Sequence, residues 1–380
     1  MGERPRFDEA PPSDAIDFAP GQPSADLLPL AALQAASARY FEEAHPLELN
    51  YGEKPGDLRF RQALAEFLQR QSGLSTDPDG LFLSGGNSQG LDFVCQQFSQ
   101  PGDVVLVEDP SFYLAFDVFR DHGLQVVPVA LDGTGFDLRA LDAAIRAHRP
   151  RMVYTIPSFQ NPTGQTLTLE KREHLMALSR EHDFLVVADE VYQLLWGREP
   201  APPSLGTMSA QGNVIALGSF SKIIAPGLRL GWLQTDPHRV RQMTKAGFIR
   251  SGGNVNHLTS HWVRQLLLAG QVDQNLPVLR AAYQARNDAL HAALTAHCEP
   301  FLSWSQPAGG YFIWAQLRDG RRARDLLASA RAAGTGFVAG DRCSAGHGFD
   351  RCLRLSFAHY GPERLAAGVA RLAQVFHAQD

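Results

Sequence analysis

The chain of 380 residues is 44% hydrophobic and 20% charged, a composition typical of a globular protein and not of a disordered one. At ~150 residues per domain, this length suggests two or three domains. The net charge of −5 leaves no basic excess to hold a nucleic-acid backbone, so we expect no nucleic-acid partner.

No stretch approaches the ~18 consecutive apolar residues of a membrane span, so we expect no membrane partner. The first residues lack the apolar core of a signal peptide, and the four cysteines form no C-x-x-C pair. These features favour a cytoplasmic protein.

In chain order, residues 1–45 predict an arm followed by an amphipathic helix at 30–43. From about residue 80, short β-branched runs alternate with helical patterns such as 138–148 and 169–182. The strand candidates are residues 81–83, 104–107, 125–129, 152–156, 184–188, 214–217 and 230–233. Several are apolar at successive positions, as in strands covered on both faces. This alternation predicts an α/β domain with a mostly parallel central sheet flanked by helices.

The pattern changes near residue 280. A long helix is predicted at 277–296, followed by strands near 311–317 and 352–357, which indicates a smaller α+β domain. We therefore expect three parts. An N-terminal arm and helix at 1–45 pack with the small domain, a large domain occupies 46–280, and the small C-terminal domain occupies 281–380.

Ligands of a parallel sheet bind beyond the carboxyl ends of its strands, so we look for ligand-binding residues directly after each predicted strand. Residues 84–90 read Ser-Gly-Gly-Asn-Ser-Gln-Gly and open a helix, whose free N–H groups can bind an anion. The loop has neither the lysine of a P-loop nor a G-x-G-x-x-G spacing. A glycine turn with a serine cap would explain this loop equally well.

Two further segments follow strand candidates. Asp189 and Tyr192 place a carboxylate and a phenol where both can face one ligand, although a helix-capping aspartate and a packed tyrosine are an alternative. Lys222 lies among small hydroxyl and apolar residues, with Arg229 seven positions later. A desolvated lysine beside a cation has a lowered pKa and can act as a nucleophile, whereas most lysines extend into solvent.

These segments, taken in order, resemble the fold-type I pyridoxal-phosphate aminotransferases of the aspartate aminotransferase superfamily. The most similar branch contains the 2-aminoadipate aminotransferases and the effector domains of MocR-type regulators. The resemblance extends from about Gly21 to the C-terminus and rests on residues 21–23, 51–52, 86–92, 108–112, 157–164, 189–192, 219–232, 309–312 and 353–355. It implies that the cofactor is pyridoxal 5′-phosphate and that the large domain binds it.

The resemblance implies a role for each residue that matches a family motif. Lys222 matches the lysine that forms a Schiff base with the cofactor, and Asp189 matches the carboxylate that keeps the pyridine nitrogen protonated. Tyr192 and Asn161 match the hydrogen-bond partners of the ring's phenolic oxygen. Phe112 stands where the family stacks an aromatic ring, more often a tyrosine, on the cofactor. Lys222, Asp189 and Tyr192 are the expected catalytic residues.

The resemblance also implies the phosphate and substrate contacts. The expected phosphate ligands are Asn87, Ser88, Ser219, Ser221 and Arg229, together with Tyr51 from the neighbouring subunit of a homodimer with shared active sites. Arg354 matches the arginine that holds the substrate α-carboxylate through a bidentate fork. Gly21 and Asn161 are the other expected substrate contacts.

The implied reaction is transamination from an L-amino acid to a 2-oxo acid by a ping-pong scheme, in which Lys222 moves the proton. A lyase or decarboxylase of the same fold would share the cofactor residues and is an alternative. A MocR-type sensing domain is disfavoured, because those proteins carry a DNA-binding segment before the motifs, which here begin by Gly21. We expect a bulky or apolar amino acid, or 2-aminoadipate, as substrate rather than aspartate.

His257 and His261 have the i, i+4 spacing of some metal ligands, but no glutamate follows the first histidine as in H-E-x-x-H. A polar helix face is the simpler interpretation, so we expect no metal site.

Overall fold

Each of the seven predicted apolar runs forms a strand of one sheet in the computed structural model, which describes residues 14–378. The strands are β2 (Leu81–Ser84), β3 (Val104–Asp109), β4 (Gln125–Ala130), β5 (Met152–Thr155), β6 (Leu185–Asp189), β7 (Val214–Ser219) and β8 (Gly231–Gln234). Their order is β2-β8-β7-β6-β5-β3-β4, and β8 alone runs opposite to the other six strands. The predicted mostly parallel sheet is confirmed.

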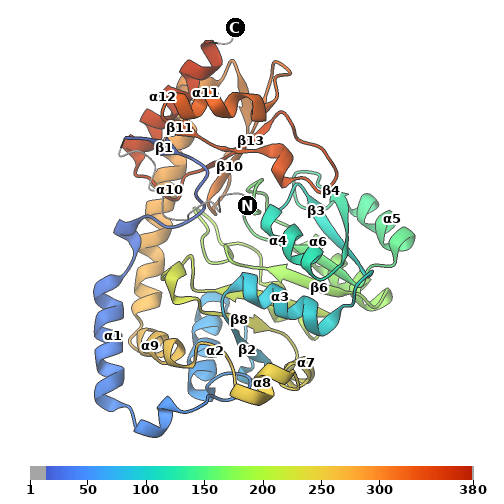
Figure 1. Ribbon diagram of the computed structural model, residues 1–380, viewed down its shortest axis with the longest axis vertical. Helices are drawn as coiled ribbons and strands as arrows, with labels where there is room; N and C mark the ends of the chain where they lie inside the picture. Colours follow the sequence, from blue (N-terminus) through green and yellow to red (C-terminus); the bar gives the residue numbers. More distant parts are fainter. Residues whose placement is uncertain (1–13, 379–380) are drawn as a thin grey trace, which may run out of the picture.

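Helices cover both faces of this sheet (Figure 1). Helices α3 (Asn87–Phe98) and α4 (Tyr113–Asp121) contribute to one apolar cluster, and α5 (Leu138–His148) and α6 (Leu169–Glu181) contribute to another. Successive strand residues point to opposite faces of a sheet. Accordingly, Val105 and Val107 belong to the first cluster, whereas Leu106 belongs to the second. Coverage on both faces explains why β5, β6 and β7 are buried at every position.

The smaller sheet has the order β12-β13-β10-β9 and is antiparallel throughout. Its strands are β9 (Leu302–Trp304), β10 (Phe312–Leu317), β12 (Val338–Ala339) and β13 (Cys352–Ser356), accompanied by α11 (Leu327–Ala332) and α12 (Pro362–His377). This is the predicted α+β domain. The remaining helices of the large domain are α2 (Leu58–Ser72), α7 (Pro237–Met243), α8 (Gly247–Gly252) and α9 (His257–Leu268).

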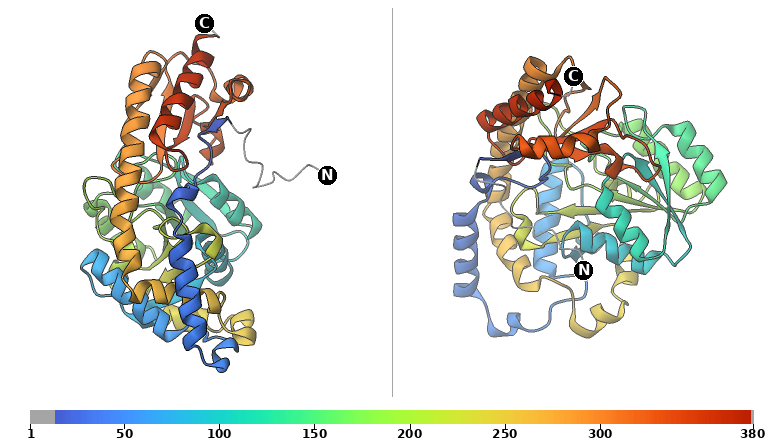
Figure 2. Two further views of the ribbon diagram at one scale, coloured as in Figure 1. Left: turned by 90° about the vertical axis from the view of Figure 1, so that its left-hand side faces the viewer. Right: turned by 45° about the horizontal axis from the view of Figure 1, so that its top comes forward.

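Helix α10 (Gln271–Cys298) connects the two domains as one continuous helix of 28 residues (Figures 1 and 2). The sequence predicts a helix that starts at Pro277. The helix instead begins after Gly270, whose φ of 66° makes the turn from α9, and it contains Pro277. Buried Leu276 and Leu279 hold both sides of the proline against the core. The predicted boundary between residues 280 and 281 lies inside this helix and stays a prediction.

The N-terminal segment divides between the two domains. Strand β1 (Ile16–Asp17) pairs in parallel with β11 (Thr335–Gly336) of the small domain. Helix α1 (Leu30–Glu43) differs from the expectation, because it packs along α9 of the large domain. The ring of Tyr40 stacks on that of His261, with centroids 5.0 Å apart. The amphipathic pattern of α1 predicts a buried face, but it carries no information about which helix that face meets.

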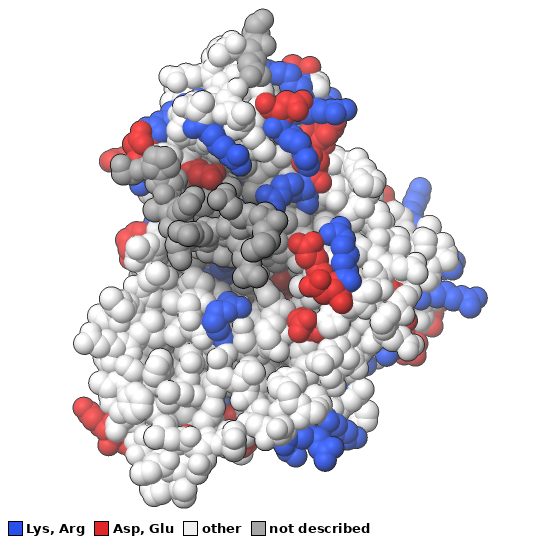
Figure 3. All heavy atoms as spheres, viewed as in Figure 1, with Lys and Arg blue, Asp and Glu red and all other residues white. Residues whose placement is uncertain are grey.

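On the face drawn in Figure 3, acidic and basic side chains are interspersed, and the lower part around α1 carries few charges. Within residues 14–378, no helix combines the length and the apolar character needed to cross a membrane.

Candidate active site

The carboxyl ends of β6 and β7 open into a pocket of about 630 Å³ between the two domains. Residues 19–22 of the N-terminal segment close one side, and Phe312 and Arg354 of the small domain close another. The pocket therefore lies where ligands of parallel sheets bind, and it draws its walls from all three parts of the chain.

Asp189, the last residue of β6, is buried and receives two hydrogen bonds. Asn87 Nδ2 donates to Oδ1 at 2.5 Å, and the Tyr154 hydroxyl donates to Oδ2 at 3.0 Å. Burial raises the pKa of Asp189, while these two donors and the positive charge of Lys222 oppose that rise. The carboxylate is thus held in a defined orientation, ready to meet a cationic group in the pocket.

Lys222 follows β7 and reaches the same pocket. Its Nζ donates a hydrogen bond to the carbonyl oxygen of Gly21 at 2.6 Å. Burial lowers the pKa of Lys222 to about 8; Asp189 counteracts this shift, and the guanidinium groups of Arg354 and Arg229 add to it. A lysine with this pKa is partly neutral near physiological pH, which a nucleophile or general base requires.

An anion cradle lies beside Lys222. Helix α3 begins after Gly86 at the pocket wall. The first backbone N–H groups of a helix have no acceptor within the helix, so they are free to bind an anion. Gly86 has a φ of 86°, which favours glycine, and a Cβ atom there would lie 3.2 Å from Nη2 of Arg229, so the guanidinium lies close to the loop. Ser219 and Ser221 add two hydroxyl groups whose Oγ atoms lie 2.9 Å apart. Amide, guanidinium and hydroxyl donors in one place fit a phosphate group.

Arg354 on β13 lies on the small-domain side of the pocket and is buried. Its Nη1 donates to Asn161 Oδ1 at 2.9 Å, and its Nη2 donates to the Ala19 carbonyl oxygen at 2.7 Å. The guanidinium also lies 4.2 Å from the centre of the Phe312 ring. Among the described residues its Nε has no acceptor, although it is buried. A buried, incompletely paired guanidinium with Asn161 beside it suits a carboxylate ligand.

The pocket wall contains nearly every residue that the sequence singles out. These residues are Gly21, Asn87, Ser88, Phe112, Asn161, Asp189, Tyr192, Ser219, Ser221, Lys222, Arg229 and Arg354. Tyr192 is buried, which raises the pKa of its hydroxyl, and its ring contacts that of Tyr311. Tyr51 is not part of this wall, because its side chain is 86% exposed on the surface.

Sequence reasoning missed two features of the site. Tyr154 lies in an apolar strand, where nothing distinguishes a tyrosine that binds Asp189 from a packed one. The backbone carbonyl of Ala19 accepts a hydrogen bond from Arg354, and that of Gly21 accepts one from Lys222. Every residue has a backbone carbonyl, so the residue type does not reveal such a contact. Phe312 could have been found, because it stands in the Gly-Gly-Tyr-Phe motif at 309–312.

The histidine pair lies elsewhere, on α9. The Nε2 atoms of His257 and His261 are 3.4 Å apart, and His257 Nε2 lies 2.9 Å from the Glu48 carbonyl oxygen. Across residues 14–378, no group of three or more His, Cys, Asp or Glu side chains could hold a metal ion.

The chain matches the family model described as aminotransferase class I and II over residues 13–372. It is 32% identical to a 2-aminoadipate transaminase of Thermus thermophilus, covering 94% of this chain and 89% of that protein. It is 30% identical to an aromatic-amino-acid aminotransferase of Thermococcus litoralis, covering 95% and 88%. A solved kynurenine aminotransferase of Pyrococcus horikoshii, in complex with PMP, superposes with a TM-score of 0.90 at 29% identity over 97% of this chain and 92% of that one.

The family match covers nearly the whole chain, and the pocket offers a half-buried lysine, a carboxylate and a phosphate cradle of the kind that pyridoxal phosphate requires. Transamination needs an amino acid and a 2-oxo acid as its two substrates. The chain belongs to the class I and II aminotransferases and is a pyridoxal-phosphate-dependent enzyme of fold type I.

Proposed function

We propose that the enzyme transfers the amino group of a bulky apolar or aromatic L-amino acid, with Lys222 as the amine that holds the cofactor and moves the α-proton. The observation that carries this proposal is the convergence of Lys222, Asp189 and Arg354 on one pocket that apolar side chains also line. When bound, pyridoxal phosphate supplies an aldehyde that condenses with amines and a ring that accepts the electron pair of the α-carbon.

Lys222 has the properties of the proton carrier. Its lowered pKa of about 8 lets Nζ accept a proton from the substrate α-carbon and return it within the same cycle. The Gly21 carbonyl that now accepts from Nζ must release it before the amine can act.

Asp189 stabilises positive charge on the ring nitrogen in this proposal. Asn87 and Tyr154 each donate to one oxygen, so the carboxylate is oriented before any ligand arrives. The donors at the start of α3, the two serine hydroxyls and Arg229 hold the phosphate. Phe112 provides an aromatic wall, and Tyr192 and Asn161 provide polar groups to the same pocket.

Arg354 orients the substrate by its α-carboxylate. The Ala19 carbonyl now accepts from Nη2, and a carboxylate is a stronger acceptor for a guanidinium than a neutral carbonyl. Asn161 Oδ1 fixes the other terminal nitrogen, so the fork presents a constant geometry. We therefore infer that substrate entry displaces the carbonyl groups of residues 19 and 21 from both cations.

The side-chain part of the pocket favours an apolar substrate. Phe112, Tyr113, Leu114 and Val118 line it at the start of α4. Among the described residues, the basic side chains of the pocket wall are Lys222, Arg229 and Arg354, all assigned to cofactor or α-carboxylate. An acidic side chain would enter without a counter-ion, and an unpaired buried charge is costly. Of the two relatives named above, the aromatic-amino-acid enzyme is the better guide to the substrate.

A half-reaction screen tests the substrate class. Each amino acid is mixed with the holoenzyme, and the loss of cofactor absorbance is followed without an acceptor. We expect phenylalanine, tyrosine and leucine to react at least about tenfold faster than aspartate and 2-aminoadipate, equal to about 1.4 kcal/mol of discrimination. Aspartate or 2-aminoadipate as the best donor by a wide margin would contradict the proposal.

We propose further that the enzyme is a homodimer in which Tyr51 contributes to the partner's phosphate site. Tyr51 is 86% exposed, and Phe41, Leu47 and Leu49 close to it in sequence are exposed as well. Clustered exposed apolar side chains favour burial against another subunit. The sparsely charged lower part of the face in Figure 3 is compatible with such an interface.

A further inference from the structure

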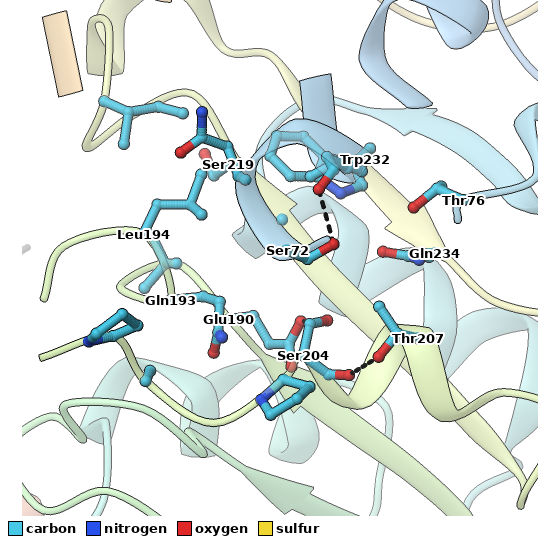
Figure 4. A pocket seen from close by; sticks show the side chains of 18 of the residues that line it. Ser72, Thr76, Glu190, Gln193, Leu194, Ser204, Thr207, Ser219, Trp232 and Gln234 are labelled. Carbon is cyan, nitrogen blue, oxygen red and sulfur yellow. Dashed lines mark hydrogen bonds between the residues drawn. The ribbon is translucent and has the colours of Figure 1, made fainter. Parts of the chain in front are cut away.

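A second cavity, of about 150 Å³, lies behind the segment that joins β7 to Lys222 (Figure 4). We name it the rear cavity and define it by Thr76, Glu190, Leu194, Ser219, Trp232 and Gln234. Val191 and Ser219 line both the rear cavity and the active-site pocket. One water needs only ~10–15 Å³ of such space, so the rear cavity has room for a small organic molecule.

The walls of the rear cavity are largely apolar and include two indole rings. Trp196 and Trp232 provide aromatic surfaces, and Leu68, Leu194 and Pro203 provide aliphatic ones. Pockets that bind small molecules combine such walls with a few polar groups that fix orientation. An apolar planar molecule would displace water from these surfaces, and this burial of apolar surface would stabilise the complex.

Two polar side chains that line this cavity have no hydrogen-bond partner among the described residues. The side chain of Gln234 is 8% exposed and makes no hydrogen bond within residues 14–378. Thr76 is 7% exposed, and its Oγ1 is a buried atom without a partner among the described residues. Figure 4 shows the oxygen ends of both side chains directed into the open space, with Leu194 on the opposite side. Buried polar groups normally have partners, so these two mark where a ligand would bind.

The charge of the lining excludes an ionic ligand. Glu190 is the only ionisable residue among those lining the cavity, and its carboxylate already accepts hydrogen bonds from Ser204 Oγ and from the Leu205 N–H. An anion would be repelled by Glu190 and would find no basic partner. A cation would have to replace donors that Glu190 already has.

We propose that the rear cavity binds a small, uncharged, planar molecule that carries a carboxamide or hydroxyl group, and that its occupancy is coupled to cofactor binding. A Cβ atom on Gly218 would lie 2.0 Å from the Trp232 ring, so the indole rests directly on the strand that leads to Ser219. A molecule against Trp232 and Ser219 therefore contacts the same segment that holds the phosphate on its other face. Coupling between two such sites is reciprocal.

Benzamide is the probe, titrated into the holoenzyme by calorimetry. We expect saturable binding of one molecule per chain. Gln234→Leu keeps the size of the side chain but removes its donor and acceptor, so it should weaken binding by roughly twofold to tenfold. Thr76→Val should act in the same direction. Ala201→Trp at the rim fills the space and should abolish binding, whereas Gln125→Leu, an exposed change on β4, should leave it unchanged.

Benzoate has the same shape with a negative charge and should not bind. Bound benzamide should slow release of the cofactor from the holoenzyme, into a trap that binds free pyridoxal phosphate, at least twofold. Absence of saturable binding, or equal binding to the wild type, Gln234→Leu and Ala201→Trp, would overturn the site, and an unchanged release rate would overturn the coupling. Neither measurement involves amino-acid turnover, so their failure is distinct from failure of the proposed function.

Discussion

Replacing Arg354 by lysine tests whether the guanidinium fork, rather than its charge, binds the substrate. Arg354 presents two terminal nitrogens with fixed acceptors at 2.9 Å and 2.7 Å, and the second acceptor is the carbonyl that a carboxylate would replace. A lysine retains the positive charge, but its single ammonium group cannot donate two parallel hydrogen bonds to a carboxylate as the guanidinium fork can. One charge-assisted hydrogen bond contributes about 1.5–3 kcal/mol, which is roughly a tenfold to 150-fold loss in kcat/KM.

The loss should be of similar size for every amino acid, because all of them share the α-carboxylate. The assay compares kcat/KM for phenylalanine, leucine and aspartate in wild type and Arg354→Lys, with cofactor content and the melting temperature as controls for folding. A loss confined to acidic donors would mean that Arg354 binds the side chain. Unchanged kcat/KM for all donors would refute the assignment.

Three further predictions concern the cofactor residues. In the cofactor-free protein, reductive methylation of Lys222 should increase as the pH passes through about 8, because burial lowers the pKa of Lys222 and the neutral amine is the reactive form. Exposed lysines should become reactive near their usual pKa of ~10.4. Peptide mapping by mass spectrometry measures both, and methylation of Lys222 over the same pH range as the exposed lysines would contradict the prediction. Asp189→Asn should retain the cofactor but lose roughly tenfold to a thousandfold in turnover, since a neighbouring carboxylate shifts the pKa of a cation by ~1–3 units; near wild-type turnover would refute the role of its charge. If Tyr51 acts across the dimer, mixing Lys222→Ala and Tyr51→Ala chains should create one intact site in each hybrid dimer and give more activity than either parent. No gain in activity in a hybrid verified by mass spectrometry, or an active monomer in sedimentation, would show that Tyr51 does not act across the dimer.

The local elements were the most predictable part of the fold. Helix α5 occupies the predicted residues, since Asp137 caps its first turn and Arg149 ends it in the left-handed region. The seven runs became seven strands; burial on both faces accounts for the continuous apolar sequence of inner strands such as β5, β6 and β7, whereas the edge strand β4 is partly exposed. The start of α10 was predicted wrongly, because the effect of Pro277 depends on the tertiary contacts that hold the helix on both sides of it.

For the proposed active site, the sequence alone determined which residues match the family motifs and their order along the chain, and the structure brings most of them together in one pocket. Only the tertiary structure decided what those groups contact. The pairing of Tyr154 with Asp189, the carbonyl groups of Ala19 and Gly21 on Arg354 and Lys222, and the packing of α1 on α9 all join residues distant in the chain. Such contacts depend on how whole layers pack and, for the carbonyl groups, on backbone atoms that every residue shares, so no local pattern of side chains encodes them.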